Sequence, residues 1–164
     1  MPSVHDWIKA YGRAWEDRDD DAVGELFFPG AIYRSHPFRE PLRGRDAIRT
    51  YWRQATGSLT GISLTFGRPI TDGAHTSVEW WAILRSDQGT ATLSGALILR
   101  FGTDGRCEEL REYWHLDEDH AIPRARRLGT VAHRGTGTPR AGRSVRVVRF
   151  WFTPSGVTPR TGTR

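Results

Sequence analysis

Glu112 is the residue of this sequence with the strongest pattern for acid–base chemistry. It alternates with Leu110 and Trp114, and a strand places every second side chain on one face. If that face lines a pocket, the carboxyl group loses hydration between two apolar neighbours and its pKa rises. Such a group can act as a general acid or base near neutral pH. In the competing interpretation, Glu112 pairs with an arginine or lies on the outer face with Glu108 and Arg111.

His36 and Tyr11 are the next candidates for moving or holding a proton. His36 titrates near neutrality and follows an expected short strand at residues 31–35. Strict alternation along that strand points His36 away from the interior, although Pro37 can twist the chain. Tyr11 can donate a hydrogen bond, but an aromatic residue at helical spacing is usually part of a core.

Tryptophan is abundant, with 7 residues, and several of these residues could border a ligand. Trp15, Trp80 and Trp114 are more often core residues, yet a pocket lined by tryptophan suits a flat apolar or aromatic molecule. His115 and His120 lie near acidic side chains, but their spacing on a strand and loop is not that of a metal site. Glycine-rich phosphate loops and nucleophile-elbow motifs are missing from the sequence. We therefore expect neither a metal nor a cofactor.

The elements that must position these side chains divide into helices first and strands second. Apolar residues at helical spacing predict a helix at 4–17, and Asp20 or Asp21 can cap a short second helix that ends at residue 28. After a turn at Pro29-Gly30 and the strand at 31–35, a third helix is expected at 45–55. Alternation then predicts strands at 62–66, 75–85, 90–101 and 107–116. This order indicates an α+β fold in which a curved antiparallel sheet wraps on three helices and leaves a pocket between them.

The charge distribution separates two kinds of sequence within 164 residues. Residues 1–120 carry 14 basic and 19 acidic side chains, whereas residues 121–164 carry 10 arginines and no acid. The division predicts a folded domain at 1–120 and an arginine-rich tail at 121–164, disordered or exchanged within a dimer. The tail could bind phosphate backbones through its charge and a strand-like segment at 144–152, fold back on the acidic body, or be an unselected extension.

Two runs carry a resemblance to a known superfamily. The run LFFPGAIYRSHPFREPLRGRDAIRTYW (26–52) and the run LRFGTDGRCEELREYW (99–114) resemble the SnoaL-like and ketosteroid-isomerase-like branches of the nuclear transport factor 2-like superfamily. The resemblance covers about residues 4–118 and implies a cone-shaped α+β barrel. This fold hosts isomerases, cyclases, dehydratases, hydrolases and proteins without catalytic activity.

The resemblance also assigns positions. The isomerase's oxyanion-binding tyrosine falls at Tyr11, its general-base aspartate at Ser35 beside His36, and its second oxyanion donor at Leu97. A serine hydroxyl cannot abstract a carbon-bound proton at neutral pH, and leucine cannot donate a hydrogen bond. Steroid isomerisation by that mechanism is therefore not expected. The cavity-facing positions of the last strand include Glu112.

These observations lead to one principal hypothesis and one alternative. The first is a cofactor-independent enzyme that isomerises, cyclises, dehydrates or hydrolyses an apolar or aromatic molecule. Glu112 or His36 would move the proton and Tyr11 would bind an oxygen. The expected lining consists of Trp15, Tyr33, Trp80, Leu97 and Trp114. The alternative is a non-catalytic ligand-binding or assembly domain, with the basic tail as the interaction element. Convergence of Glu112 and His36 on one pocket would favour the enzyme.

Partners and location follow from composition and from the resemblance. The superfamily implies a homodimer through the outer sheet face, where Trp81 and Ile83 point outward. No apolar run approaches the roughly 18 residues of a membrane helix and no signal peptide is visible, so we expect a cytoplasmic protein without membrane contact. Nucleic acid could bind only weakly, through the tail. One lysine beside 23 arginines suggests an actinobacterial, GC-rich coding sequence.

Overall fold

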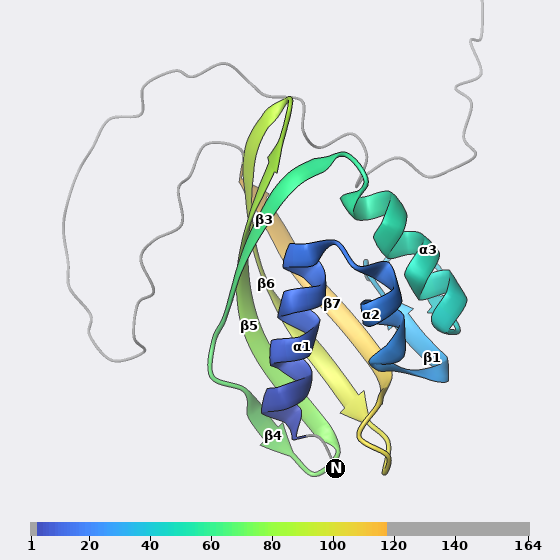
Figure 1. Ribbon diagram of the computed structural model, residues 1–164. Helices are drawn as coiled ribbons and strands as arrows, with labels where there is room; N and C mark the ends of the chain where they lie inside the picture. Colours follow the sequence, from blue (N-terminus) through green and yellow to red (C-terminus); the bar gives the residue numbers. More distant parts are fainter. Residues whose placement is uncertain (1–2, 118–164) are drawn as a thin grey trace, which may run out of the picture.

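The N-terminal helix α1 (Val4–Asp17) forms where apolar residues recur at helical spacing (Figure 1). In this computed structural model, which describes residues 3–117, Ser3 and Asp6 form a capping box at the start of the helix. The residues of its apolar face are buried: Trp7, Ile8, Tyr11, Ala14 and Trp15. Arg18 ends the helix in the left-handed conformation. The predicted bounds of this helix are confirmed.

The second helix is shorter than predicted and the following strand is longer. Helix α2 spans Asp20–Glu25, and its cap is Asp19, whose side chain accepts a hydrogen bond from the Ala22 backbone N–H at 2.8 Å. Strand β1 already begins at Phe27 and runs to Arg34. The Pro29-Gly30 dipeptide lies inside this strand, at an irregularity in its pairing, and the turn predicted there was wrong.

The remaining elements follow the predicted order with small changes of boundary. The short strand β2 (Leu42–Arg43) precedes helix α3 (Arg45–Thr56). The antiparallel strands are β3 (Leu59–Phe66), β5 (His75–Ser86), β6 (Gly89–Phe101) and β7 (Cys107–Asp117). A short strand β4 (Ile70–Asp72), which the sequence analysis missed, pairs with the start of β5.

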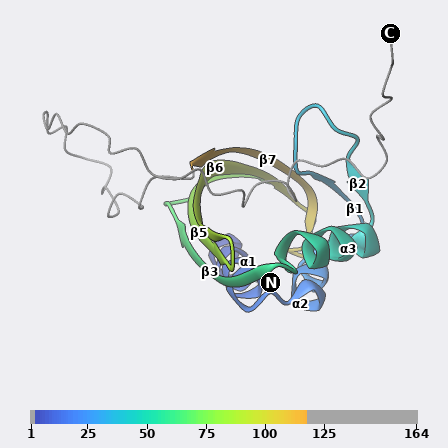
Figure 2. The same cartoon turned by 90° about the horizontal axis from the view of Figure 1, so that it is seen from above.

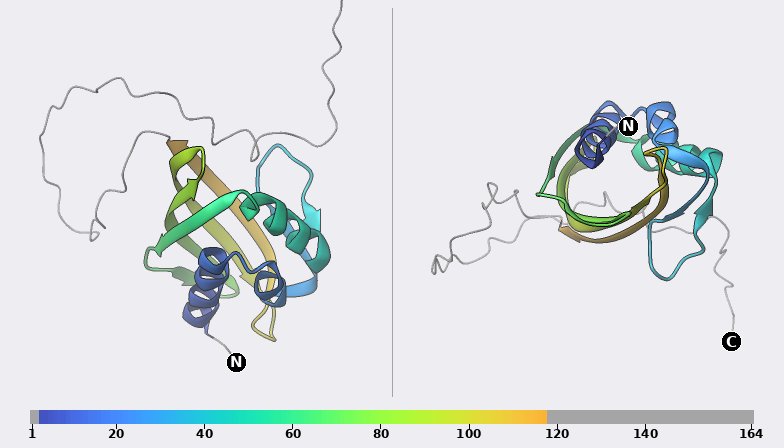
Figure 3. Two further views of the ribbon diagram at one scale, coloured as in Figure 1. Left: turned by 45° about the horizontal axis from the view of Figure 1, so that its top comes forward. Right: turned by 90° about the horizontal axis from the view of Figure 1, so that it is seen from below.

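The sheet is mixed, because β1 joins its edge in parallel with β7. The strand order is β2-β1-β7-β6-β5-β3, and every pair along this path except β1–β7 is antiparallel. The sheet curls around one side of the molecule and the three helices close the other (Figure 2). The two views in Figure 3 show the same arrangement, an unclosed cone with α1 along the inner face of the sheet. The predicted α+β cone is therefore confirmed.

Gly95 marks the place where the curved sheet is most tightly packed. It pairs with Trp80 on β5 and with Trp114 on β7, so it lies between two large side chains in one row across the sheet. A Cβ at this position would collide with the backbone oxygen of Tyr113 and would lie 2.8 Å from the Trp114 Cβ. Glycine at this position lets β6 and β7 approach closely while the sheet bends.

The predictions for the tail and for its strand-like segment are not covered by the described residues. The arginine-rich tail at 121–164, with its strand-like segment at 144–152, lies outside the described residues, and its role stays a prediction. Among residues 3–117 no helix is long and apolar enough to cross a membrane.

Candidate functional site

Glu112 lies on the inner face of β7 and is only 3% exposed. Its partner across β6 is Leu97, and Leu97 in turn pairs with Val78 on β5. Both of these side chains are 1% exposed. The carboxyl group therefore extends from an apolar row of the sheet, as alternation with Leu110 and Trp114 predicts. The outer-face position and the arginine pair considered for Glu112 are not what the structure shows.

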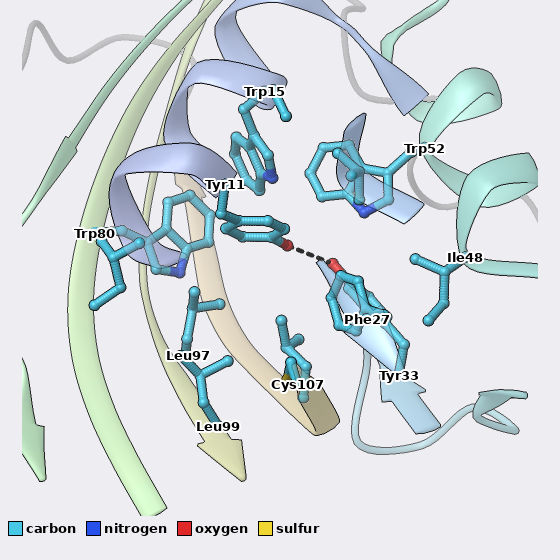
Figure 4. Close-up of a cluster of buried hydrophobic side chains, with 14 of the residues drawn as sticks. Tyr11, Trp15, Phe27, Tyr33, Ile48, Trp52, Trp80, Leu97, Leu99 and Cys107 are labelled. Atoms are coloured by element: carbon cyan, nitrogen blue, oxygen red, sulfur yellow. Dashed lines mark hydrogen bonds between the residues drawn. The ribbon is translucent and has the colours of Figure 1, made fainter. Parts of the chain in front are cut away.

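A chain of hydrogen bonds leads from helix α1 through β1 to this carboxyl group. The Tyr33 hydroxyl donates to Glu112 Oε2 at 3.0 Å, and the Tyr11 and Tyr33 hydroxyl oxygens are 3.4 Å apart (Figure 4). Tyr33 has one proton and gives it to Glu112, so Tyr11 must be the donor in the second contact. Both tyrosines are completely buried, and burial together with the nearby Glu112 charge raises their pKa values well above 10. They remain protonated donors at any physiological pH.

The second carboxyl oxygen of Glu112 has no such partner. Among the described residues, Oε1 is buried and accepts or donates no hydrogen bond. Loss of hydration raises the pKa of Glu112 to about 8, and the Tyr33 hydrogen bond opposes that rise. At neutral pH the group is therefore mainly a carboxylic acid. Because Tyr33 donates to Oε2, the acid proton belongs on Oε1.

Glu112 borders a pocket of about 460 Å³ at the edge of the sheet. The pocket exists because β1 pairs with β7 only as far as Arg34, opposite Arg111, and the chain then turns away. The Trp114 indole N–H holds the departing chain by donating to the Ser35 carbonyl oxygen at 3.1 Å. Residues from the turn and from both faces of β7 form the lining: Ser35, His36, Pro37, Glu112, Tyr113, Trp114, His115 and Leu116.

His36 shares this pocket with Glu112, although alternation from β1 pointed it away from the interior. The strand ends at Arg34, and residues 35–38 form a bend and a turn. Within that turn, His36 Nδ1 accepts a hydrogen bond from the Phe38 backbone N–H at 3.2 Å. Accepting at Nδ1 places the proton of the neutral ring on Nε2.

The remaining predicted site residues belong to one buried aromatic cluster (Figure 4). Trp15 and Trp80 are each 2% exposed, with ring centres 5.2 Å apart. Trp52, which was not among the expected lining residues, lies 4.6 Å from Trp15 between ring centres. The indole N–H groups of all three tryptophans have no hydrogen-bond partner among the described residues.

Tyr33 and Tyr51 contribute more than the sequence analysis assigned to them. Tyr33 was expected only to line a cavity, yet it is the hydrogen-bond donor to Glu112. Tyr51, on α3, packs 5.5 Å from Tyr33 between ring centres, and burial with the nearby Glu112 charge raises its pKa. Alternation along β1 indicates the face of this strand on which Tyr33 lies. It does not reveal that β1 lies beside β7, since this parallel pair joins distant parts of the chain.

The cone-shaped sheet and the helices that close it are the architecture of the ketosteroid-isomerase-like α+β fold. The sequence profile of the SnoaL-like domain matches residues 8–110, and the chain belongs to this family. The match ends two residues before Glu112, so membership by itself does not assign that residue a role. A comparison with curated proteins finds no match.

Solved structures with the same fold include proteins of several activities. A putative scytalone dehydratase from Novosphingobium aromaticivorans is similar with a TM-score of 0.63 and 16% identity, over 79% of this chain and 93% of that one. SalBIII, an epoxide hydrolase/cyclase-like enzyme in pyran ring formation of salinomycin, has a TM-score of 0.60 and 18% identity, over 68% and 89%. A hypothetical protein from Catenulispora acidiphila with a ketosteroid isomerase-like fold, in complex with trimethylamine, has a TM-score of 0.61 and 18% identity, over 68% and 86%.

Proposed function

We propose that this protein is a cofactor-independent enzyme that moves a proton on a small apolar or aromatic molecule, with Glu112 as the acid–base group. One observation carries the proposal: Glu112 is among the residues that line a pocket, and its buried carboxyl group has one unpartnered oxygen. Leaving a buried polar atom unpaired costs about 1–3 kcal/mol. A ligand that supplies the missing partner recovers that cost, as expected at a binding or catalytic site.

Tyr11 and Tyr33 stabilise Glu112 through hydrogen bonds. Their two hydroxyl groups form a chain in which each proton points toward the carboxyl group. This arrangement stabilises the carboxylate that forms when Glu112 gives up its proton. It also changes the role expected for Tyr11. Its proton is directed to Tyr33, so Tyr11 acts on the ligand through Tyr33 and Glu112 and is a positioning residue.

The aromatic cluster supplies the apolar part of the proposed site. Trp15, Trp80, Tyr33 and Leu97 belong to one buried cluster, Leu97 pairs with Glu112 across the sheet, and Trp114 lines the pocket. A low-polarity environment keeps Glu112 protonated at neutral pH, and it favours apolar or aromatic ligands over charged ones. The homodimer predicted through Trp81 and Ile83 remains a prediction, since those half-buried side chains are seen in a single chain.

Two probes of different chemistry test the proposal on the full chain. The first is hydrolysis of styrene oxide, and the second is deuterium exchange next to the carbonyl of α-tetralone. Wild type should turn over at least one of them, and Glu112→Gln should lower that rate by about 100-fold or more, the usual size of a lost general acid or base. Glu79→Gln is the control, because Glu79 is exposed on the outer face of β5. Equal rates for wild type and Glu112→Gln would show that the assignment is wrong.

The non-catalytic binding domain is the second candidate, and the dense packing of the interior favours it. Tyr11 and Tyr33 are 0% exposed, and Trp15, Trp52 and Trp80 are each 2% exposed. In that case α-tetralone should quench tryptophan fluorescence on binding, while neither probe is converted.

A further inference from the structure

Strand β7 continues beyond the end of its parallel neighbour. The pairing of β1 with β7 ends where Arg34 lies opposite Arg111, whereas β7 and β6 remain paired as far as Asp117. Within residues 3–117, the strand order places no other strand on this side of β7. In that part of the chain, the end of β7 therefore has a strand neighbour on one side only.

The pocket lies along this side of β7. Its lining includes five consecutive residues of the strand, Glu112–Leu116, and residues 35–37 of the turn after β1 complete it. Successive side chains of a strand point to opposite faces of the sheet, so a pocket on either face would contact alternate residues only. A pocket that contacts all five runs along the edge of the strand, where backbone N–H and C=O groups can pair with a further strand. We call Glu112–Leu116 the β7 edge.

The side chains of the β7 edge offer aromatic and apolar surface on both faces of the sheet. On the outer face Tyr113 is 47% exposed, and on the inner face Trp114 and Leu116 are half-buried. Phe38, which follows the lining residue Pro37, is 91% exposed. Aromatic and β-branched side chains pair well across neighbouring strands. The β7 edge therefore suits an extended segment that is rich in such residues.

The sequence after the described residues contains a segment of this kind. Residues 144–152 read SVRVVRFWF, and six of these nine residues are valine, phenylalanine or tryptophan. These residue types favour strands, and Gly142 and Pro154 bound the run, as expected for a strand between turns. Residues 121–164 contain arginines and no acid, whereas residues 1–120 are acidic overall. Electrostatic attraction between the two parts favours a contact of the tail with the domain.

The connection from β7 to this segment is long enough for the segment to return to the β7 edge. The connection, 118–143, has 26 residues, and a random coil of that length has a root-mean-square span of roughly 28 Å. The β7 edge extends about 17 Å back from Asp117, at about 3.4 Å per residue. Such a tether gives the segment an effective concentration on the order of millimolar, which a separate chain in dilute solution does not reach.

We propose that residues 144–152 pair with the β7 edge of the same chain as an additional strand of the sheet. Backbone hydrogen bonds supply the affinity, and the valine and aromatic side chains pack beside those of the edge. This inference does not rest on the proposed function, because the edge can be paired whether or not Glu112 transfers a proton. Since Glu112 belongs to the edge, the bound segment covers the pocket, and a ligand reaches the pocket when the segment leaves.

The first test measures amide hydrogen exchange in the full chain. In wild type, residues 112–116 and 144–152 should both be protected. Val148→Pro removes a backbone N–H from the segment and should speed exchange in both regions by about tenfold or more, the value of one lost hydrogen bond. Thr136→Pro, a matched proline in the connection, should leave both unchanged, and the amides of β5 report on global stability. Unprotected residues 144–152 in wild type, or an effect of Val148→Pro on the segment alone, would overturn the inference.

The second test identifies the chain that supplies the strand. Cys107 is 0% exposed, so a thiol-reactive spin label on Ser144→Cys attaches at the introduced cysteine. The label should broaden the amide signals of Tyr113 and His115, and adding Val148→Pro to the labelled chain should abolish the broadening. In a mixture of labelled chains and isotope-enriched unlabelled chains, the enriched signals should stay sharp. Broadening in the mixture would show that a second copy supplies the strand, and sharp signals in the labelled chain itself would show that the segment does not reach the β7 edge.

Discussion

Replacing Glu112 by glutamine should remove a specific pH dependence of stability. The pKa of Glu112 is about 8 in the folded protein, against the ordinary glutamate value of 4.5 in the unfolded chain. Between these values the folded state keeps a proton that the unfolded state releases. The free energy of unfolding of wild type therefore falls as pH rises through this window, and the stabilisation present at low pH is lost.

The size of this change in the free energy of unfolding follows from the shift in the pKa of Glu112. At about 1.4 kcal/mol per pKa unit, the window from 4.5 to about 8 corresponds to an upper value of roughly 5 kcal/mol. Glu112→Gln has no proton to release and keeps an amide oxygen as acceptor for Tyr33. The variant should therefore gain stability relative to wild type as pH rises, and most of the gain should be complete near pH 8.

Urea unfolding of the full chain between about pH 5 and pH 9 measures this difference. Histidines and surface acids titrate in both proteins, so the difference between the two curves isolates position 112. The control variant Glu79→Gln should run parallel to wild type, because Glu79 is exposed. Parallel curves for Glu112→Gln and wild type would refute the argument that the carboxyl group is desolvated.

Three further substitutions test the local arguments. Tyr33→Phe removes the hydrogen-bond donor to Glu112 and should raise the pKa of that carboxyl group by about 1–2. The reason is that a hydrogen bond to a charged group contributes about 1.5–3 kcal/mol. An unchanged NMR titration midpoint would disprove the contact. Gly95→Ala should cost at least about 1–3 kcal/mol in urea unfolding, because its Cβ would collide with β7, while Gly61→Ala meets nothing closer than 3.8 Å and should cost less. Asp19→Ala removes the cap of α2 and should cost about 1 kcal/mol in the same assay, and no loss would contradict the cap.

Periodicity was sufficient to predict most of the fold. The apolar face of residues 4–17 and the alternation in 75–101 depend on local geometry, and the structure confirms both. The boundary between α2 and β1 was wrong because Phe27 and Phe28 suit either element. Tertiary contacts determine that the strand begins here, since the Cys107 backbone N–H donates to the Leu26 carbonyl oxygen at 3.0 Å. Such contacts cannot be inferred from local sequence.

The site was predictable only in part. Alternation placed Glu112 on the inner face and gave the correct direction for its pKa. It could not show that Tyr33 lies within 3.0 Å, because that contact requires β1 to pair in parallel with β7. Alternation could not predict the place of His36, because β1 ends at Arg34 and the pattern does not continue beyond the strand. The tail at 121–164 and the domain boundary near residue 120 remain predictions.

The most direct test of the account is an NMR titration of the Glu112 side-chain carboxyl carbon in the full chain. The account predicts a midpoint near 8, because the buried carboxyl group is stabilised as the neutral acid. The same titration in Tyr33→Phe should move the midpoint upward, which links the value to the observed hydrogen bond. A midpoint near 4.5, the value of an ordinary solvated carboxyl group, would contradict the buried acid on which the proposed function rests.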